Sequence, residues 1–162
     1  MTRVAGKVGF SYGDPVSVPV AILIAGANGS GKTTFARQVL PLLHPEASFI
    51  NADEIQRQGG EFTSDLAASR IYLPRIARWR ALGYRTVLHF IEVPSADFAV
   101  QRVQQRVQNG GHDIPEADIR RRFARGRDLF DGVYKGAVHE WHHWTTDDQG
   151  LRRSAHESRN DA

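Results

Sequence analysis

The sequence predicts an α/β fold with a mainly parallel sheet, and two observations favour it. Apolar runs of strand length alternate along the chain with stretches of helical periodicity, as in strand–helix–strand units. The first run, residues 20–25, leads into a glycine-rich turn that is followed at once by a helical stretch. Strand, turn and helix in that order are typical of the first unit of an open, three-layer α/β sheet.

The length of 162 residues suits one globular domain with a single core. We expect a loose N-terminal extension over residues 1–18, the domain over residues 19–147, and a polar, frayed tail over residues 148–162. No apolar run reaches the roughly 18 residues that a membrane-spanning helix needs, so we expect a cytoplasmic protein without a membrane partner. The absence of cysteine excludes disulfides and thiolate metal sites.

Arginine dominates the basic residues, and the chain carries a net charge of +3. The arginines concentrate in residues 70–85 and 120–127. A basic domain can bind nucleic acid, but arginine clusters bind any phosphate. Because no nucleic-acid-binding module is visible in the sequence, we do not expect nucleic acid as a partner.

The first half of the chain contains two predicted strands and two predicted helices. Residues 20–25 form a continuous apolar run, which is typical of a strand buried on both faces of a parallel sheet. A helix should follow over residues 31–40 and end at a proline. Residues 47–54, with the sequence ASFINADE, predict a second strand. A helix over residues 69–83 should begin at a serine cap and end at a glycine.

The second half continues the alternation. Residues 85–93 are dense in β-branched side chains and predict a strand. Ser95 should cap a helix that ends at the following pair of glycines. A further helix should begin at Pro115 and repeat its apolar residues at helical spacing as far as Ala137. A last strand is predicted near residues 141–146.

The glycine-rich turn has the sequence GANGSGKT and fits the phosphate-loop pattern G-x-x-x-x-G-K-[ST] at every fixed position. Its glycines allow backbone N–H groups to face a phosphate, Lys32 brings a charge to the outer phosphates, and the Thr33 hydroxyl can bind Mg²⁺. The helix behind it adds a positive N-terminal end. We therefore predict a nucleotide site. The expected binding residues are Gly26, Asn28, Gly29, Ser30, Gly31, Lys32, Thr33 and Thr34.

Asp53 ends the second predicted strand, so it should lie at the carboxyl edge of the sheet, where ligands bind in open α/β sheets. A carboxylate there can accept the proton of a substrate hydroxyl during phosphoryl transfer. The alternative is that Asp53 or Asn51 caps the following helix. The phosphate loop favours Asp53 as a catalytic base.

Two groups of arginines flank the predicted turn at residues 109–112. Arg102 and Arg106 are four residues apart on one helix, where like charges repel by a few tenths of a kcal/mol unless an anion lies between them. The group in residues 120–127 could face them across a transferred phosphate and stabilise the charge of the transition state. The alternative is a solvated helix face whose arginines pair with nearby carboxylates.

Residues 139–143, HEWHH, fit the H-E-x-x-H pattern of zinc hydrolases. The pattern has only three fixed letters, and few residues follow it to provide a third ligand. We interpret these histidines as polar residues at a helix end, where imidazoles suit the helix dipole, and do not expect metallopeptidase activity.

Four stretches together resemble the zeta-toxin-like P-loop kinases: IAGANGSGKTTFARQVLP, FINADEI, GYRTVLHFIEVPSADFAVQRVQQRVQNGGHDIP and IRRRF. The resemblance covers most of residues 20–147, and the GGHDIP lid between two arginine-bearing helices is its most specific part. It implies a P-loop kinase fold, ATP and Mg²⁺ as cofactors, and an antitoxin as a partner. The family's studied toxins phosphorylate UDP-N-acetylglucosamine.

The resemblance also implies roles for individual residues. Lys32 and Thr33 match the family's phosphate-loop lysine and metal-binding threonine, and Asp53 matches its catalytic aspartate. The lid arginines match Arg106 and one of three consecutive arginines, of which we expect Arg121. The three are Arg120, Arg121 and Arg122.

The chain departs from the family pattern between the aspartate strand and the strand at residues 85–93. The family has a helix, a strand and another helix there, on the order of 35 residues, whereas 22 residues separate Gly60 from Gly83. We therefore expect the sheet to lack one central strand. Either the strand at residues 85–93 lies beside the phosphate loop, with Glu92 a candidate for the missing acid, or the sheet keeps an apolar edge that a second copy or a partner covers.

Three functions follow from these residues. The first is a small-molecule kinase whose acceptor is unknown, a UDP-N-acetyl sugar being what the resemblance suggests. The second is a nucleotide-binding but inactive remnant that acts through a partner. The third and least favoured is a polynucleotide kinase that uses the arginine surface, which requires a steep salt dependence of binding.

Overall fold

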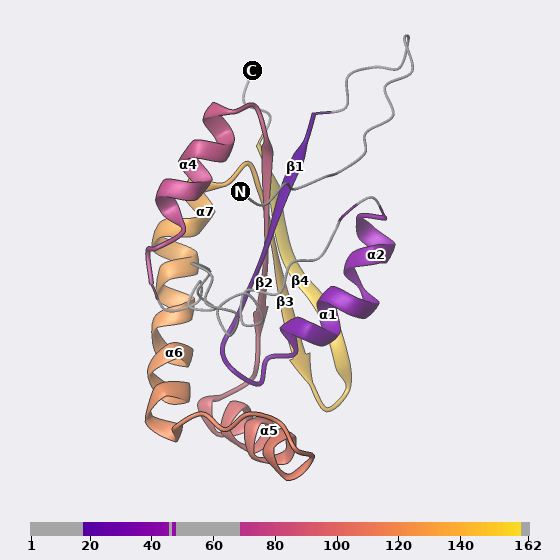
Figure 1. The fold of residues 1–162 in the computed structure, drawn as a ribbon, viewed down its shortest axis with the longest axis vertical. Helices are drawn as coiled ribbons and strands as arrows, with labels where there is room; N and C mark the ends of the chain where they lie inside the picture. The colour runs from indigo at the N-terminus through magenta and orange to yellow at the C-terminus, as the bar shows by residue number, and fades with distance from the viewer. Residues whose placement is uncertain (1–17, 46, 48–68, 160–162) are drawn as a thin grey trace, which may run out of the picture.

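The computed structural model describes residues 18–45, 47 and 69–159. Figure 1 shows three layers, with a central sheet between two sets of helices. Asp53 and, apart from Ala47, the predicted second strand lie outside the described residues, as do Asn51 and Gly60.

The described strands form one sheet in the order β1-β2-β3-β4. β1 (Val20–Ala25) pairs in parallel with β2 (Arg85–Glu92), which pairs in parallel with β3 (Glu140–Asp147). β4 (Gly150–Ser158) runs antiparallel to β3. The prediction of an α/β fold with a mainly parallel sheet is confirmed.

β2 lies directly beside β1, the first of the two arrangements that the short middle region allowed. Val20 is opposite Arg85 and Ala25 is opposite Phe90, so the two strands end at the same edge. Among the described strands, none pairs with the other side of β1.

Helices cover both faces of the sheet (Figure 1). The helices are α1 (Lys32–Gln38), α2 (Leu40–Leu43), α4 (Leu73–Ala81), α5 (Ala96–Gln108), α6 (Glu116–Leu129), the π-helix η2 (Phe130–Tyr134) and α7 (Lys135–Ala137). α1 and α2 lie on one face of the sheet, and α4, α6 and α7 lie on the other. α5 lies at the carboxyl end of the parallel strands.

Local sequence explains most of these bounds. The Ser95 hydroxyl accepts a hydrogen bond from the Phe98 amide at 3.1 Å and caps α5 as predicted. The predicted helix over residues 31–40 is instead two short helices, and Pro41 lies in the first turn of α2, where a missing N–H costs nothing. None of the described helices is long and apolar enough to cross a membrane.

The apolar core has one cluster on each face of the sheet and a third between α5 and α6, which contains Val93, Ala99, Val100, Val103 and Ile119. The larger cluster joins the strands to α4 and α6 and contains Leu23, Ala25, Tyr72, Ile76, Leu88, Phe90, Leu129, Phe130, Tyr134, Val138 and Trp141. The smaller cluster joins them to α1 and α2 and contains Phe35, Leu40, Ile91 and Trp144. Since β1 and β2 contribute to the clusters on both faces, their continuous apolar runs are explained.

The C-terminal segment corrects two expectations. Residues 150–158, expected to be a frayed tail, form β4, whose backbone pairs with β3 along its length. Residues 140–143, expected at a helix end, belong to β3. The helix ends earlier because Val138 adopts extended backbone angles after α7.

Histidines stack across the sheet on the face that carries α1. The fully buried His89 lies opposite His142 with a centroid separation of 4.7 Å, and His142 stacks on His156 at 5.9 Å. The Trp144 indole donates a hydrogen bond to Nδ1 of His89. Burial, and then the adjacent His142, lower the pKa of His89 to about 3. This imidazole is therefore neutral in the folded protein.

Candidate functional site

The phosphate loop connects β1 to α1 and lies against β2. A Cβ at Gly26, where φ is +148°, would lie 2.3 Å from the Ile91 carbonyl oxygen, so no other residue fits there without a shift of the backbone. Ser30 donates its backbone N–H to the Ala27 carbonyl at 3.2 Å, which closes the turn. The loop is thereby held at the carboxyl edge of the sheet.

The other side of the loop lies against α5. A Cβ at Gly29 would be 2.7 Å from the Ala99 carbonyl oxygen and 3.3 Å from Cβ of Arg102. Gly31 has no neighbour that a Cβ would meet, and its φ of +89° is the left-handed conformation that starts α1. Gly26 and Gly29 thus allow the loop to pack closely against β2 and α5, and Gly31 allows the left-handed backbone of the turn.

The polar side chains of the loop differ in their hydrogen bonding and exposure. Lys32 donates to the carbonyls of Gly26 at 2.7 Å and Ala27 at 2.9 Å, so its ammonium lies over the turn. The Ser30 hydroxyl is buried and makes no hydrogen bond to a described residue. Thr33 and Thr34 are exposed in the first turn of α1.

An arginine of α6 reaches the loop. Arg122 donates from Nη1 to Oδ1 of Asn28 at 3.2 Å, across 94 residues of sequence. Its neighbours point elsewhere: Arg120 pairs with Asp97 and Glu116, and Arg121 pairs with Asp118 on its own helix. Of this triplet, Arg122 is therefore the arginine with a hydrogen bond to the loop, whereas the expected Arg121 pairs on its own helix.

The two arginines of α5 have different hydrogen-bond partners. Arg106 donates to the His112 carbonyl at 2.6 Å and so stabilises the turn after α5. Arg102 lies one turn earlier, over the Phe98 ring at 5.4 Å, and its Nη1 is 3.4 Å from the Thr146 hydroxyl. The Cβ of Arg102 would lie 3.3 Å from a Cβ at Gly29, so Arg102 is beside the loop, whereas the expected Arg106 contacts the turn after α5.

Glu92 ends β2 at the same edge as the loop, but its carboxylate is already paired. Its Oε2 accepts from Arg127 of α6 at 2.8 Å and lies 2.8 Å from Nε2 of His143. Arg127 also contacts Asp131. The role of Glu92 as the missing acid is therefore not favoured, and the pairs instead join α6, which carries Arg122, to the sheet.

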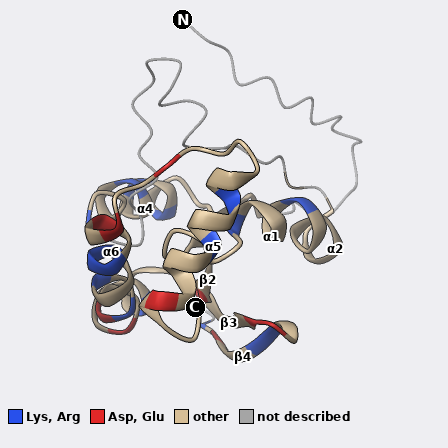
Figure 2. Ribbon diagram, turned by 90° about the horizontal axis from the view of Figure 1, so that it is seen from below, with Lys and Arg blue, Asp and Glu red and all other residues tan. Residues whose placement is uncertain are grey.

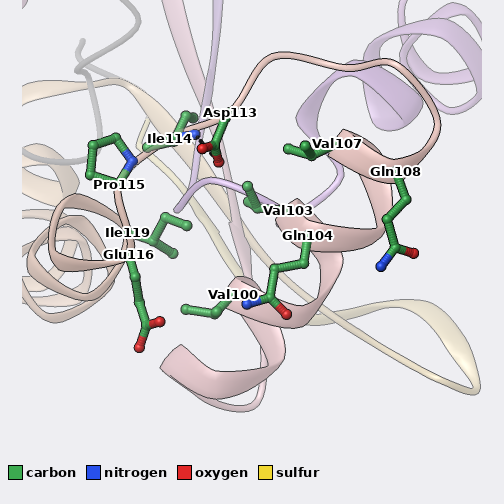
Figure 3. Close-up of a pocket in the computed structure, with 10 residues that line it drawn as sticks. All are labelled: Val100, Val103, Gln104, Val107, Gln108, Asp113, Ile114, Pro115, Glu116 and Ile119. Carbon is green, nitrogen blue, oxygen red and sulfur yellow. Dashed lines mark hydrogen bonds between the residues drawn. The ribbon is translucent and has the colours of Figure 1, made fainter.

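Two cavities adjoin α5. One of about 470 Å³ lies between α5 and the start of α6 (Figure 3) and is lined by Val100, Val103, Val107 and Ile119, with carboxylates of Asp113 and Glu116 at its rim. Its lining brings no positive charge, so it is unsuited to a phosphate. The other, of about 330 Å³, lies between α5 and the β3–β4 turn and includes Arg102 and Asp147. Figure 2 shows in blue the basic residues of α5 and α6, which are all arginines.

The H-E-x-x-H histidines, His139 and His143, lie just before the start of a strand and within it, and not on a helix. His143, in β3, is held by Glu92. His139 contacts the Thr86 hydroxyl through Nδ1 at 2.8 Å. Among the described residues, no group of three or more His, Asp or Glu side chains is arranged to hold a metal ion.

Comparisons with known proteins support the fold. No family model and no curated protein matches this chain. The crystal structure of the AvrRxo1-ORF1:-ORF2 complex with ATP contains a chain of similar fold, with 15% identity and a TM-score of 0.63. The complex with sulphate ions gives 14% identity and a TM-score of 0.62.

In both comparisons the alignment covers 85% of this chain and 58% of the other. The chain therefore spans less than two thirds of the length of these structures. At this identity the likeness shows the fold alone, an α/β fold with a mainly parallel sheet. The more specific resemblance to zeta-toxin-like kinases stays a prediction.

Proposed function

We propose that this chain is an ATP-dependent phosphotransferase of the zeta-toxin-like kind, acting on a small-molecule acceptor. The observation that carries the proposal is the contact between Arg122 and Asn28, because it brings an arginine of a separate helix to a phosphate loop that already contains Lys32. A lysine and an arginine that converge on one loop are the groups that phosphoryl transfer requires.

The loop fits a nucleotide phosphate. The Ser30 hydroxyl is buried without a partner among the described residues, and a Cβ at Gly31 would meet no described atom, so that side of the turn is open. Both features are expected where a backbone cradle surrounds an anion. The AvrRxo1 complex that contains ATP supports ATP as the nucleotide.

The residues have distinct proposed roles. ATP supplies the phosphoryl group, and Mg²⁺ neutralises charge on the phosphates when bound. Lys32 binds the outer phosphates, the Thr33 hydroxyl is the protein's ligand for Mg²⁺, and Arg122 stabilises charge on the transferred group. Asp53 accepts the proton of the acceptor hydroxyl. Arg106 acts indirectly, through its hydrogen bond to the lid backbone.

The proposed acceptor and partner follow from the resemblance and from the similar structures. The resemblance suggests a UDP-N-acetyl sugar, and the polar cavity beside Arg102 is the candidate site for the part of the nucleotide that extends beyond the loop. An antitoxin is the proposed partner, supported by the fact that the similar chains were solved as two-component complexes. A second copy of the chain is the other candidate.

The Asp53→Asn variant tests the enzymatic role. With ATP, Mg²⁺ and UDP-N-acetylglucosamine or a panel of other hydroxyl acceptors, the wild type should release ADP in an acceptor-dependent way. The variant should lose this release by about 10²- to 10⁴-fold, the usual contribution of a general base, and still bind ATP. ADP release can be followed by a coupled assay, and ATP binding by calorimetry.

Asp128→Asn is the matched control, because Asp128 is an exposed carboxylate near the end of α6 and lines neither cavity. It should behave as wild type. Equal release by wild type and Asp53→Asn would refute the base assignment. ATP binding without release for any acceptor would favour the inactive remnant.

A further inference from the structure

β4 presents a long unpaired edge. The strand contains nine residues and lies at the end of the sheet, so one side of its backbone pairs with no described strand. The side chains of its residues 152–158 are exposed, as is that of Arg159 after it. An edge of this length is a template for a further strand, because the N–H and C=O groups on that side pair with no described strand.

The register with β3 shows which face each β4 side chain takes. Trp144 is opposite Arg153 and His142 is opposite His156, so both β4 residues lie on the face that carries α1. Thr145 is opposite Arg152, which therefore lies on the α6 face. Trp141, which contacts Phe130 of the α6-face core, is opposite Glu157, which lies on the same face as Arg152.

A β-bulge in the pairing of β4 with β3 makes the distribution of β4 side chains between the two faces symmetric about the strand's centre. The register shifts between His143 and Trp144, so that Ser154 is the extra residue of β4. Its hydroxyl is 3.0 Å from that of Thr145, and Ala155 is opposite His143, so both residues lie on the α6 face. Counted outward from the Ser154–Ala155 bond in either direction, the first side chain therefore lies on the α6 face, the second on the α1 face and the third on the α6 face.

We propose that two copies of the chain associate through their β4 strands, paired antiparallel about a two-fold axis at the Ser154–Ala155 bond. In this register Arg152 lies opposite the partner's Glu157, and the pair occurs twice. Arg153 lies opposite the partner's His156 on the other face. The two four-stranded sheets become one continuous sheet, and the free edge groups of both strands are paired.

The charges of β4 favour a second copy over another partner. The strand carries arginines on one side of its centre and Glu157 on the other, a pattern that is complementary to itself in the antiparallel direction. Arg152 already pairs with Asp147 at 2.7 Å, but its five donors can serve two carboxylates. Glu157 accepts from Arg159 through Oε1, which leaves its other oxygen available to the partner.

Sedimentation equilibrium of the purified chain over a range of concentrations tests the interface. The wild type should dimerise, and Arg152→Glu or Glu157→Arg should each weaken the dimer roughly tenfold or more, because each places like charges opposite one another twice. Arg78→Glu, on the exposed side of α4, is the matched control and should dimerise as wild type. Circular dichroism of each variant checks that it is folded.

Mixing the two reversed variants provides the sharper test. In the mixed dimer, glutamate at 152 lies opposite arginine at 157 and glutamate at 157 lies opposite arginine at 152, so a heterodimer of about wild-type affinity should form. A monomeric wild type would overturn the proposal. So would a dimer that neither reversal weakens, or two folded variants that do not rescue each other.

Discussion

Replacing Arg122 by alanine should lower the rate of phosphoryl transfer about 10³-fold, the lower end of what an arginine on the transferred phosphate contributes. Arg122 is the arginine of its triplet that contacts the phosphate loop, through Asn28. Its charge is needed mainly in the transition state, so the dissociation constant for ATP should change much less than kcat. The measurement is kcat and KM from acceptor-dependent ADP release, with ATP affinity determined separately.

Arg121→Ala is the matched control, because Arg121 is adjacent, exposed and paired with Asp118 on its own helix. Loss of such a surface pair costs little, and kcat should stay within a few-fold of wild type. Arg122→Lys should recover only part of the activity, since a lysine lacks the planar fork of donors. Equal losses for Arg121→Ala and Arg122→Ala would show that the triplet acts only through net charge.

Lowering the pH from 7.5 to 5 should reduce the free energy of unfolding by about 2 kcal/mol through His89 alone. The pKa of His89 is about 3 in the folded protein and 6.5 when unperturbed, and burial is the main cause of the difference. Between these values the unfolded chain binds a proton that the folded chain does not, so stability falls as the pH falls below 6.5. Each pH unit in that window changes stability by about 1.4 kcal/mol.

Urea denaturation at the two pH values measures this effect. His89→Leu removes the titrating group, so its stability should depend much less on pH, although loss of the Trp144 hydrogen bond lowers its stability at both values. His142, whose pKa is also lowered by burial, leaves a residual slope of the same sign. His112→Leu, at an exposed position, should keep the wild-type slope. An unchanged slope in His89→Leu would contradict the assignment.

The parts of the fold that were predictable are those in which local signals agree with the tertiary structure. β1 and β2 are continuous apolar runs because the sheet buries both their faces, and Ser95 caps α5 where the helical period begins. β4 has no such signal. It is an edge strand with exposed polar side chains, held by backbone pairing with β3 that the sequence does not record.

The candidate site also has residues that could be predicted from the sequence and residues that could not. The phosphate loop is a local motif, so its residues were found from the sequence. The choice of Arg122 depends on which face α6 turns to the loop, and a usable signal existed: Arg122 is three residues after the buried Ile119 and four before the buried Gly126, on the packed face of the helix. Arg120 and Arg121 lie on the exposed face. The pairing of Glu92 with Arg127 and His143 joins three distant segments and left no sequence signal.

Calorimetric titration of the purified chain with ATP in the presence of Mg²⁺, with Lys32→Ala in parallel, tests the central claim most directly. The wild type should bind one ATP, and the variant should lose this binding while remaining folded, because Lys32 brings the charge that the outer phosphates require. Thermal unfolding of both proteins without ATP provides the folding control. A folded wild type that does not bind ATP, or equal binding by Lys32→Ala, would contradict the assignment of this loop as a nucleotide site.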